Sequence, residues 1–494
     1  MEEGYSYSKI IEAKDGNKIP LCAENSSGQE ITLHSKYNPV REAEGFAAST
    51  DESILFFVVF GLAGGYHIEK LAERCPKSKI LVIENNQKSI DFLMEIPTVE
   101  KISKNRRIHI STIENIQDSL FSLYKPAIHG NLTILSLRQW ENIFKNEASL
   151  CREKITESIK ILASDYSVQS HFGKIWQKNI IINLSMAEKC LDFAAVKQSL
   201  AKARGKTAAI IAAGPSLDEN IKRLKENRHD YFIIATDTAF SSLVKQNLEC
   251  DAVISIDGQM ISHQHYMEKF MKAQKTLFVF DLCASPAAAR KVLSKTKNVL
   301  FAETGHPLAQ YASLFTGKRT FVHLEAGSGT VTIAGVSLAK ELGFGKIELF
   351  GADFSYIKGR PYCRGTYLEG QFNAKSTRFY PSEQAYTALM YRTPVIRLSD
   401  DKITTEILEA YKTSLSDFMK KKNGKSPYGD CNGKFCLSKF KSRYSKDLTN
   451  AFKSEDEIDE NSLAFTTLLP LCAKMGKGSA FLAYLKTLRY TERV

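Results

Sequence analysis

The sequence lacks any apolar run long enough to cross a membrane. Its most apolar stretch, residues 54–65, is far shorter than the ~20 residues that a spanning helix needs. Low-complexity tracts are missing too, and the hydrophobic fraction of 43% and the charged fraction of 25% are those of an ordinary globular protein. The first residues lack the basic and apolar regions of a secretion signal, and the 10 cysteines are scattered. We therefore expect a protein of the reducing cytoplasm.

Common phosphate-binding and nucleophile motifs are also missing. The GKT at 205–207 has Leu200 where a P-loop carries its first glycine, and it precedes an apolar run instead of following one. No G-x-S-x-G elbow occurs. No D-x-D occurs either, which argues against a glycosyltransferase that holds its donor through a divalent cation.

Patterns that bind metals are weak. Cys431 and Cys436 form a single C-x4-C pair with no histidine nearby, so we expect free thiols. His263 and His265 form H-x-H and could share a metal, but no third ligand is evident. We predict no metal site and no bound cofactor.

Acidic residues are too few to balance the basic ones. The formal net charge of +12 and the pI near 9.0 call for an acidic partner, which could be a nucleotide, a nucleic acid or an anionic membrane. No basic stripe interleaved with aromatic residues occurs, so we expect no nucleic-acid partner.

The most informative stretch that is present is KTAAIIAAGPSLDENI, which begins at Lys206. An apolar run at 207–213 predicts a buried parallel strand, Gly214 and Pro215 a tight turn, and the residues from Leu217 a helix. Ser216 can cap that helix, and free N–H groups of the first helical turn would favour a phosphate at the end of the strand. The alternative is an ordinary turn between a strand and a helix.

Further strands alternate with helices over 205–394. They end in or contain a carboxylate, at Asp237, Asp257, Asp281, Glu303 and Asp353. This alternation predicts an α/β fold with a doubly wound parallel sheet, and such sheets bind ligands at the edge where these carboxylates lie. Aspartate after a strand is also a common turn residue.

The flanking regions predict three more segments. Residues 1–146 resemble a Rossmann-like domain, with glycines at 61, 64 and 65 after an apolar strand and Glu84 about twenty residues later. The alternative is a domain that binds the ribose of a dinucleotide or adenosyl ligand, but the glycine spacing is not G-x-G-x-x-G, and we favour a purely structural domain. We expect 147–204 to be a helical connector and 395–494 a helical C-terminal domain.

Two more groups of residues suggest nucleotide chemistry. The sequence GSGTVTIAG at 327–335 places Ser328, Gly329 and Thr330 in a second turn that could face the first, although a plain helix cap is the alternative. Tyr356 and Tyr362 follow Asp353, and phenolic hydroxyls can donate to a phosphate as it leaves.

Six segments between about residue 30 and about residue 410 together resemble one family. They are SKYNPVREAEGF, FGLAGGYHIEKL, FGKIWQKNIIINL, IIAAGPSLDENI, EAGSGTVTIAG and LFGADFSY. As a set they resemble the motility accessory factors, which are bacterial flagellin glycosyltransferases. Their central domain is shared with archaeal 6-hydroxymethylpterin diphosphokinases and is similar to the family 42 sialyltransferases. The resemblance implies transfer of a nonulosonic acid, such as pseudaminic or legionaminic acid, from its CMP-activated form to flagellin.

The same resemblance implies roles for individual residues. The predicted donor contacts are Gly214, Pro215, Ser216, Leu217, Thr236, Asp237, Ser328, Gly329 and Thr330. Tyr356 and Tyr362 match the two tyrosines that bind the leaving phosphate. The histidine that serves those enzymes as general base has no counterpart after His323, so the base candidates are Asp257, Asp353 and Glu325.

Three functions remain open at this level. The first is a metal-independent, inverting protein O-glycosyltransferase. The second is a pyrophosphokinase that uses ATP and Mg²⁺, and the third is a flagellin chaperone without catalytic activity. The length of the chain and its additional domains favour the first.

Overall fold

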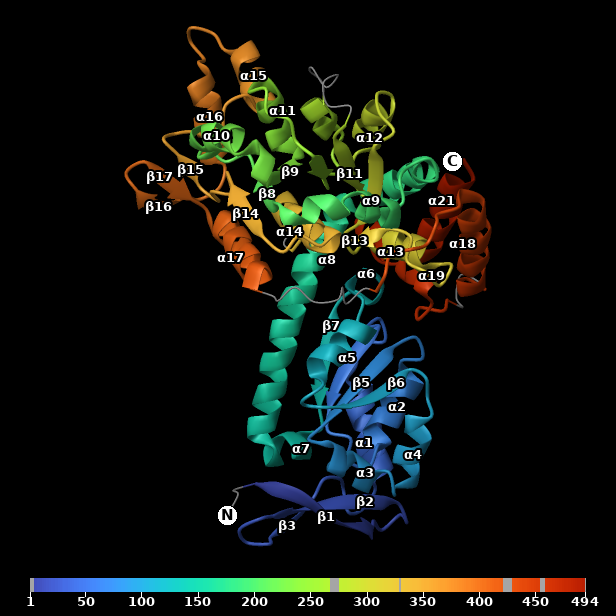
Figure 1. Ribbon diagram of the computed structural model, residues 1–494. Helices are drawn as coiled ribbons and strands as arrows, with labels where there is room; N and C mark the ends of the chain where they lie inside the picture. The colour runs from blue at the N-terminus through green and yellow to red at the C-terminus, as the bar shows by residue number, and fades with distance from the viewer. Residues whose placement is uncertain (1–3, 267–274, 328–329, 421–428, 454–457, 494) are drawn as a thin grey trace. The chain divides into compact units, whose positions relative to one another are not determined.

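The computed structural model describes residues 4–266, 275–327, 330–420, 429–453 and 458–493. Internal contacts divide the chain into two compact units. The first is Met1–Gly173 with Leu469–Ala480, and the second is Lys174–Leu468 with Phe481–Val494. Each unit has its own parallel sheet (Figure 1).

The first unit is built on a four-stranded parallel sheet in the order β6-β5-β4-β7. Its central strand β4, Phe56–Phe60, is buried along its whole length because it is apolar on both faces. A three-stranded antiparallel sheet precedes it. The other elements are β1 Tyr5–Glu12, β2 Lys18–Glu24, β3 Glu30–Thr32, α1 Pro39–Ala48, α2 Tyr66–Arg74, β5 Lys79–Glu84, α3 Gln87–Leu93, α4 Pro97–Ser103, β6 Ile108–Thr112, α5 Ile116–Leu123, α6 Pro126–His129, β7 Leu132–Ser136 and α7 Arg138–Ile143.

The glycine turn after β4 is filled by side chains of this unit. A Cβ atom on Gly61 would lie 2.6 Å from Cγ of Trp140. The indole N–H of Trp140 donates to Glu84 Oε1 at 2.9 Å, and the N–H of Leu62 donates to Oε2 at 2.8 Å. The hydroxyl of Tyr7 also donates to Oε2, at 3.1 Å. Since the buried carboxylate is held by these groups, the contacts support a structural role for Glu84.

The second unit is built on a seven-stranded parallel sheet in the order β13-β12-β11-β10-β9-β8-β14. These strands are β8 Thr207–Ile211, β9 Tyr231–Thr236, β10 Ala252–Ser255, β11 Leu277–Asp281, β12 Val299–Glu303, β13 Val322–His323 and β14 Ile347–Phe350. From β8 to β13 each strand is added on the same side, and β14 then pairs with β8 on the other side. The order therefore reverses at β8, which confirms the predicted α/β fold with a doubly wound parallel sheet.

Helices cover both faces of this sheet. Helix α14, Val331–Leu342, packs its apolar residues on Ile210, Ile234 and Ile254. On strand β11, the rings of Phe278 and Phe280 contact Phe240 of α11 and Tyr266 of the 3-10 segment η3. The other helical elements here are α9 Phe193–Ser199, η1 Ala201–Gly205, α10 Leu217–Glu226, η2 Arg228–Asp230, α11 Asp237–Lys245, η3 Met260–Tyr266, α12 Pro286–Leu293 and α13 Pro307–Leu314.

The segments expected at 147–204 and 395–494 are mainly helical. Helix α8, Lys145–Ala187, is 43 residues long and is followed by α9. Residues 395–494 begin with two strands that join a small antiparallel sheet in the order β15-β17-β16. The remaining elements are β15 Tyr356–Ile357, α15 Tyr367–Lys375, α16 Ser382–Met390, β16 Ile396–Ser399, β17 Lys402–Thr404, α17 Glu406–Lys420, α18 Leu437–Ala451, α19 Leu463–Thr466, α20 Leu469–Met475 and α21 Ala480–Arg493.

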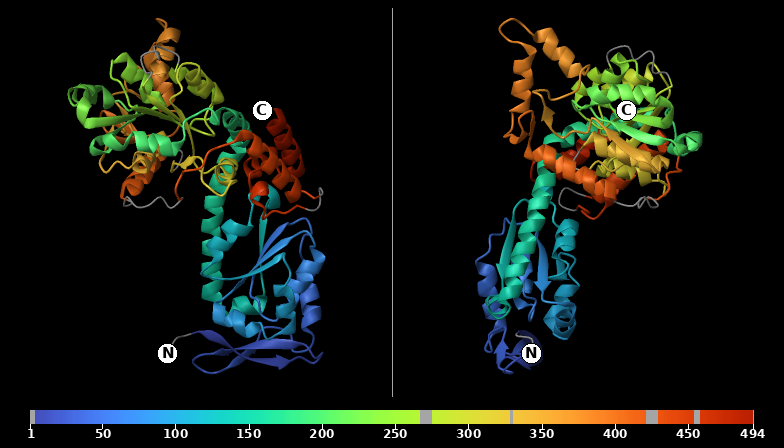
Figure 2. Two further views of the ribbon diagram at one scale, coloured as in Figure 1. Left: turned by 45° about the vertical axis from the view of Figure 1, so that its right-hand side comes forward. Right: turned by 60° about the vertical axis from the view of Figure 1, so that its left-hand side comes forward.

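Two features of this C-terminal half were not expected from the sequence. Helix α20 belongs to the first unit, where it packs on α6. Helices α15 and α16 project from the body of the second unit (Figure 1 and the right-hand view of Figure 2).

In the part of the chain that the structure describes, no helix combines the length and the hydrophobicity that a membrane crossing needs.

Candidate functional site

The carboxyl ends of the seven parallel strands gather the predicted carboxylates at one edge of the sheet. Asp237, Asp257, Asp281, Glu303 and Asp353 follow or end β9, β10, β11, β12 and β14. Because these strands run parallel, the side chains share that edge. The sequence therefore predicted the edge correctly.

The turns after β8 and β14 are locked to each other. Asp353 Oδ2 accepts the backbone N–H of Ser216 at 2.8 Å, and Oδ1 accepts the hydroxyl of Ser216 at 2.5 Å. A Cβ atom on Gly214 would lie 2.4 Å from both Asp353 Oδ2 and the carbonyl oxygen of Gly351. Gly351 itself has φ +64°, a left-handed conformation that glycine adopts without strain. Only glycine at 214 leaves room for the carboxylate.

The predicted capping role of Ser216 is wrong. Its side chain accepts no bond from the first turn of α10, and its hydroxyl instead donates to Asp353. The N–H groups of Leu217, Asp218 and Glu219 donate to carbonyl oxygens of residues 214–216. The backbone N–H groups that were expected to bind an anion here thus already donate to acceptors within the protein. The contacts of Gly214, Pro215, Ser216 and Leu217 with a phosphate stay a prediction.

Asp237 and Asp257 differ in how many of their carboxylate oxygens accept hydrogen bonds. Asp237 is 2% exposed; its Oδ2 accepts the Ser255 hydroxyl at 2.6 Å and its Oδ1 accepts the N–H of Thr238 at 2.7 Å. Thr236 Oγ1 caps α11 by accepting the N–H of Ala239. Asp257 is half-buried. Within the part of the chain that the structure describes, only its Oδ1 accepts a hydrogen bond, from the N–H of Gln259 at 2.9 Å.

Burial raises the pKa of Asp257 above its ordinary value, and the nearby carboxylate of Asp237 raises it further, against the lowering effects of the Gln259 N–H and of His265. A carboxylate with a raised pKa is a better proton acceptor near neutral pH. Asp257 is therefore better suited to this role than Asp353, whose two oxygens both accept hydrogen bonds from Ser216.

The predicted tyrosines lie over the same edge. Burial raises the pKa of Tyr362, and Tyr356 and Asp237 raise it further, against the lowering effect of Arg392. Tyr356 opens β15 and is half-buried, opposite Ile403 of β17. The segment that carries Tyr362 is anchored, because the N–H of Cys363 donates to the carbonyl oxygen of Ala213 at 2.9 Å.

Two further residues, Tyr367 and His265, lie at the candidate site, although the sequence did not indicate them as part of it. The ring of Tyr367, at the start of α15, meets the ring of His265 edge-on at 4.4 Å between centroids. Burial raises the pKa of Tyr367, and the nearby Tyr362, Asp257 and Asp237 raise it further. His265 is 7% exposed, and its Nδ1 has no hydrogen-bond partner among the residues that the structure describes. No local pattern connects Tyr367 to His265, because about a hundred residues separate them.

The remaining predicted residues are more distributed. Thr330 caps α14, and the N–H of Glu325 donates to Ser337 Oγ at 3.0 Å. Ser328 and Gly329 lie outside the described residues. Glu303 is fully buried and binds Arg319 at 2.6 Å and His323 at 2.9 Å, so it is a structural carboxylate.

Two asparagines of α8 support the loops of this edge. Asn179 Nδ2 donates to the carbonyl oxygens of Gly258 and Cys283 at 2.9 and 3.0 Å. Asn183 Nδ2 donates to those of Leu282 and Ala284 at 2.9 and 2.8 Å. These bonds fix the main chain next to Asp257, and they explain the WQKNIIIN part of the family-like segment.

His263 and His265 belong to η3. Within the described ranges, no three histidine, cysteine, aspartate or glutamate side chains come together as a metal-binding group.

Comparisons with known proteins show which family models and proteins this chain is similar to. The family model described as 6-hydroxymethylpterin diphosphokinase MptE-like matches residues 178–359. Three proteins of Treponema pallidum (strain Nichols), each named only as an uncharacterized protein, are similar in sequence. One is 42% identical over 137 residues, which is 27% of this chain and 48% of that protein, so less than half of its length is spanned. A second is 35% identical over 162 residues, 32% of this chain and 74% of that protein. The chain belongs to the family of this second protein.

A solved structure extends the comparison to the whole fold. The MAf glycosyltransferase from Magnetospirillum magneticum AMB-1 superimposes with a TM-score of 0.54 over 98% of this chain and 89% of that one. At 11% sequence identity the similarity is one of fold. Together with the MptE-like domain, it confirms the resemblance to the motility accessory factors that the sequence predicted. The third treponemal relative is 22% identical over 56% of this chain and 60% of its own length.

Proposed function

We propose that this chain is a glycosyltransferase that moves a sugar from a nucleotide-activated donor to a hydroxyl group of a protein. One observation carries the proposal: the MAf glycosyltransferase fold extends over 98% of the chain. The group formed by Asp257, His265, Tyr356, Tyr362 and Tyr367 supports it, because it lies at the edge where open parallel sheets bind ligands.

The proposed donor is a CMP-activated nonulosonic acid, and the proposed acceptor is flagellin. Both come from the segments that resemble the motility accessory factors. The donor contacts remain those named from the sequence, with a changed role for Ser216: it shapes the turn by binding Asp353. Tyr356 and Tyr362 supply hydroxyl donors, and burial keeps the Tyr362 phenol protonated by raising its pKa.

In the proposed reaction, an acceptor hydroxyl attacks the anomeric carbon of the sugar. The new carbon–oxygen bond forms as the bond from that carbon to the phosphate of CMP breaks. CMP leaves with the bonding electron pair, and hydrogen bonds from Tyr356 and Tyr362 stabilise the charge that develops on its phosphate. The acceptor proton passes to Asp257. Attack from the face opposite the leaving group inverts the anomeric centre.

The test is transfer to flagellin with purified components. The chain is incubated with flagellin and CMP-pseudaminic acid, and the intact mass of flagellin is measured. We expect a mass increase equal to the added sugar residue. Asp257→Asn should slow single-turnover transfer about 100- to 10,000-fold. Asp230→Asn is the matched control, because Asp230 is exposed on η2 at the other end of β9.

A second function is favoured by the MptE-like match to residues 178–359. A pyrophosphokinase would bind ATP with Mg²⁺ and release AMP in the presence of 6-hydroxymethylpterin. AMP release under those conditions, with no mass added to flagellin, would replace the glycosyltransferase proposal by the kinase one.

A further inference from the structure

The second unit contains a pocket at the edge of the sheet opposite the candidate functional site. Its volume is about 730 Å³, within the range of small-molecule sites. Phe232 and Leu277 line it from the first residues of β9 and β11, whereas Asp237 and Asp281 lie at the other ends of these strands. The pocket is therefore separate from the site described above.

The floor of the pocket is apolar and formed by buried side chains. Phe232 is 4% exposed and Leu277 is 8% exposed, and Val196 of α9 and Leu200, the residue that follows this helix, also line the pocket. Burial raises the pKa of the Cys250 thiol to about 12, so it is a neutral, weakly polar part of the floor. The transfer of the apolar body of a ligand from water to this floor is therefore favourable.

One ion pair in the wall is satisfied by the protein itself. Arg228 Nη2 lies 2.9 Å from Asp251 Oδ2, and this oxygen also accepts the N–H of Ile233 at 2.7 Å. Arg228 further donates to the carbonyl oxygens of Glu249 and Tyr231, both at 3.1 Å. Both charges are thus committed, and this pair is a poor binding group for a ligand.

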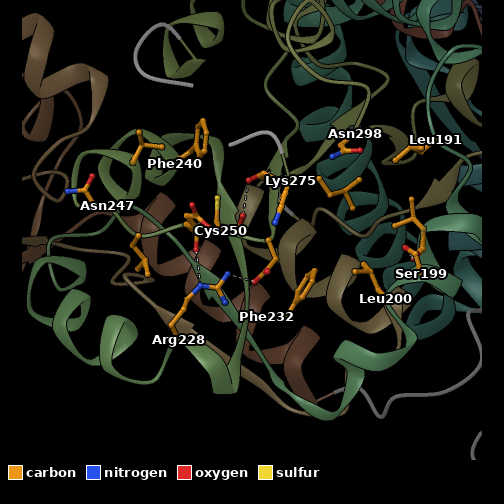
Figure 3. Close-up of a pocket in the computed structure, with 17 residues that line it drawn as sticks. Leu191, Ser199, Leu200, Arg228, Phe232, Phe240, Asn247, Cys250, Lys275 and Asn298 are labelled. Atoms are coloured by element: carbon orange, nitrogen blue, oxygen red, sulfur yellow. Dashed lines mark hydrogen bonds and ion pairs between the residues drawn. The ribbon is translucent and has the colours of Figure 1, made fainter. Parts of the chain in front are cut away.

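Lys275 is different. It lines the pocket and is exposed, and its ammonium group forms no ion pair among the described residues. Figure 3 shows it at the upper side of the pocket, with Phe232 and Arg228 at the lower side and Cys250 between them. The side chains of Asn298, Asn247 and Ser199 add hydrogen-bonding groups around the pocket.

The charges of the lining limit the class of ligand. Lys275 and Arg228 are balanced by Glu249 and Asp251, so the lining carries no net charge, and two carboxylates disfavour a multiply charged phosphate. We propose that this pocket binds an amphipathic organic monoanion, with its apolar or aromatic body on the Phe232 and Leu277 floor and its carboxylate on Lys275. The proposal does not depend on the glycosyltransferase function.

The test uses 3-phenylpropionate as the probe and isothermal titration calorimetry with the full chain. The uncharged 3-phenylpropionamide is the control for charge. We expect the anion to bind about tenfold more tightly than the amide, because a charge-assisted hydrogen bond at a partly exposed group is worth about that much. Lys275→Met should remove this preference while leaving the apolar stem in place. Lys295 is an exposed lysine two residues after the end of α12 and does not line the pocket, so Lys295→Met should retain the preference.

A second variant tests the location. Ser199→Phe places a ring at the rim of the pocket and should weaken the binding of both probes by tenfold or more, with an unchanged thermal midpoint as evidence of folding. If this variant unfolds, the comparison of Lys275→Met with Lys295→Met decides. Equal binding of anion and amide, an unchanged preference in Lys275→Met, no binding of 3-phenylpropionate at 10 mM, or tighter Lys275-dependent binding of AMP would each overturn the proposal.

Discussion

The bonds between Ser216 and Asp353 give the sharpest energetic prediction. Ser216→Ala removes the hydroxyl that donates to Asp353 Oδ1 at 2.5 Å and keeps the N–H bond to Oδ2 at 2.8 Å. A hydrogen bond to a charged group contributes about 1.5–3 kcal/mol. Both residues are half-buried, so water can partly replace the hydroxyl, and we expect a loss near 1.5 kcal/mol.

A double-mutant cycle isolates this bond. Asp353→Asn keeps an acceptor oxygen but removes the charge, so Ser216→Ala in that background should cost about 1 kcal/mol less than in the wild type. Ser241→Ala is the matched control, because the hydroxyl of Ser241 donates to a neutral carbonyl, that of Gly365, at 3.1 Å. We expect it to cost about 0.5–1 kcal/mol in either background.

The assay is urea-dependent hydrogen exchange of peptides that cover β8 and α10, so that the measured free energy of opening belongs to the central sheet. A coupling free energy below about 0.3 kcal/mol, which is the usual error of additivity, would show that the serine hydroxyl and the carboxylate do not act as a pair. A loss for Ser216→Ala no larger than that for Ser241→Ala would refute the charge assistance.

Three further predictions concern the site and its surroundings. Tyr362→Phe and Tyr356→Phe should each lower single-turnover transfer about 10- to 1,000-fold with little change in donor affinity; equal losses of rate and affinity would make them binding residues only. Transfer should survive excess EDTA, and a strict requirement for Mg²⁺ would contradict the proposed chemistry. Burial raises the pKa of Asp281 from 3.8 to about 7, so the folded state favours the protonated acid and loses stability as the pH rises between these values, by up to ~4 kcal/mol. Asp281→Asn should flatten the thermal midpoint between pH 4 and 7, and an unchanged slope would exclude this source.

The architecture was predictable from the sequence because its signals are local. The apolar run before Gly214 and the helical spacing after Ser216 predicted β8 and α10, and the structure has the helix begin at Leu217 as expected. Alternation of such runs then predicted the parallel sheet. Strands β16 and β17 were missed inside a region expected to be helical, because they are 4 and 3 residues long and carry little periodicity.

The site was predictable only in part, because its contacts join distant segments. Asp353 occupies the N–H of a residue 137 positions earlier, and no pattern near Ser216 indicates that a carboxylate will arrive there. The pairing of His265 with Tyr367 has the same cause. The carboxylates of the sheet edge were predictable, but which of them keeps a free oxygen depends on neighbours such as Ser255 and Thr238, whose contacts with Asp237 only the folded chain shows.

The asparagines of α8 bear on how such a scaffold can diversify. Asn179 and Asn183 grip main-chain carbonyls, which every amino acid possesses, in the turns that follow β10 and β11. Side chains of a helix distant in sequence thereby hold the backbone of these turns, and the side chains of the turns themselves are not needed for this. Residues such as Gln259, which is exposed beside Asp257, can be exchanged while the backbone keeps its course. Under the proposed function, a few substitutions in these turns would change which molecule the site accepts and leave the backbone in place, provided that the two asparagines remain.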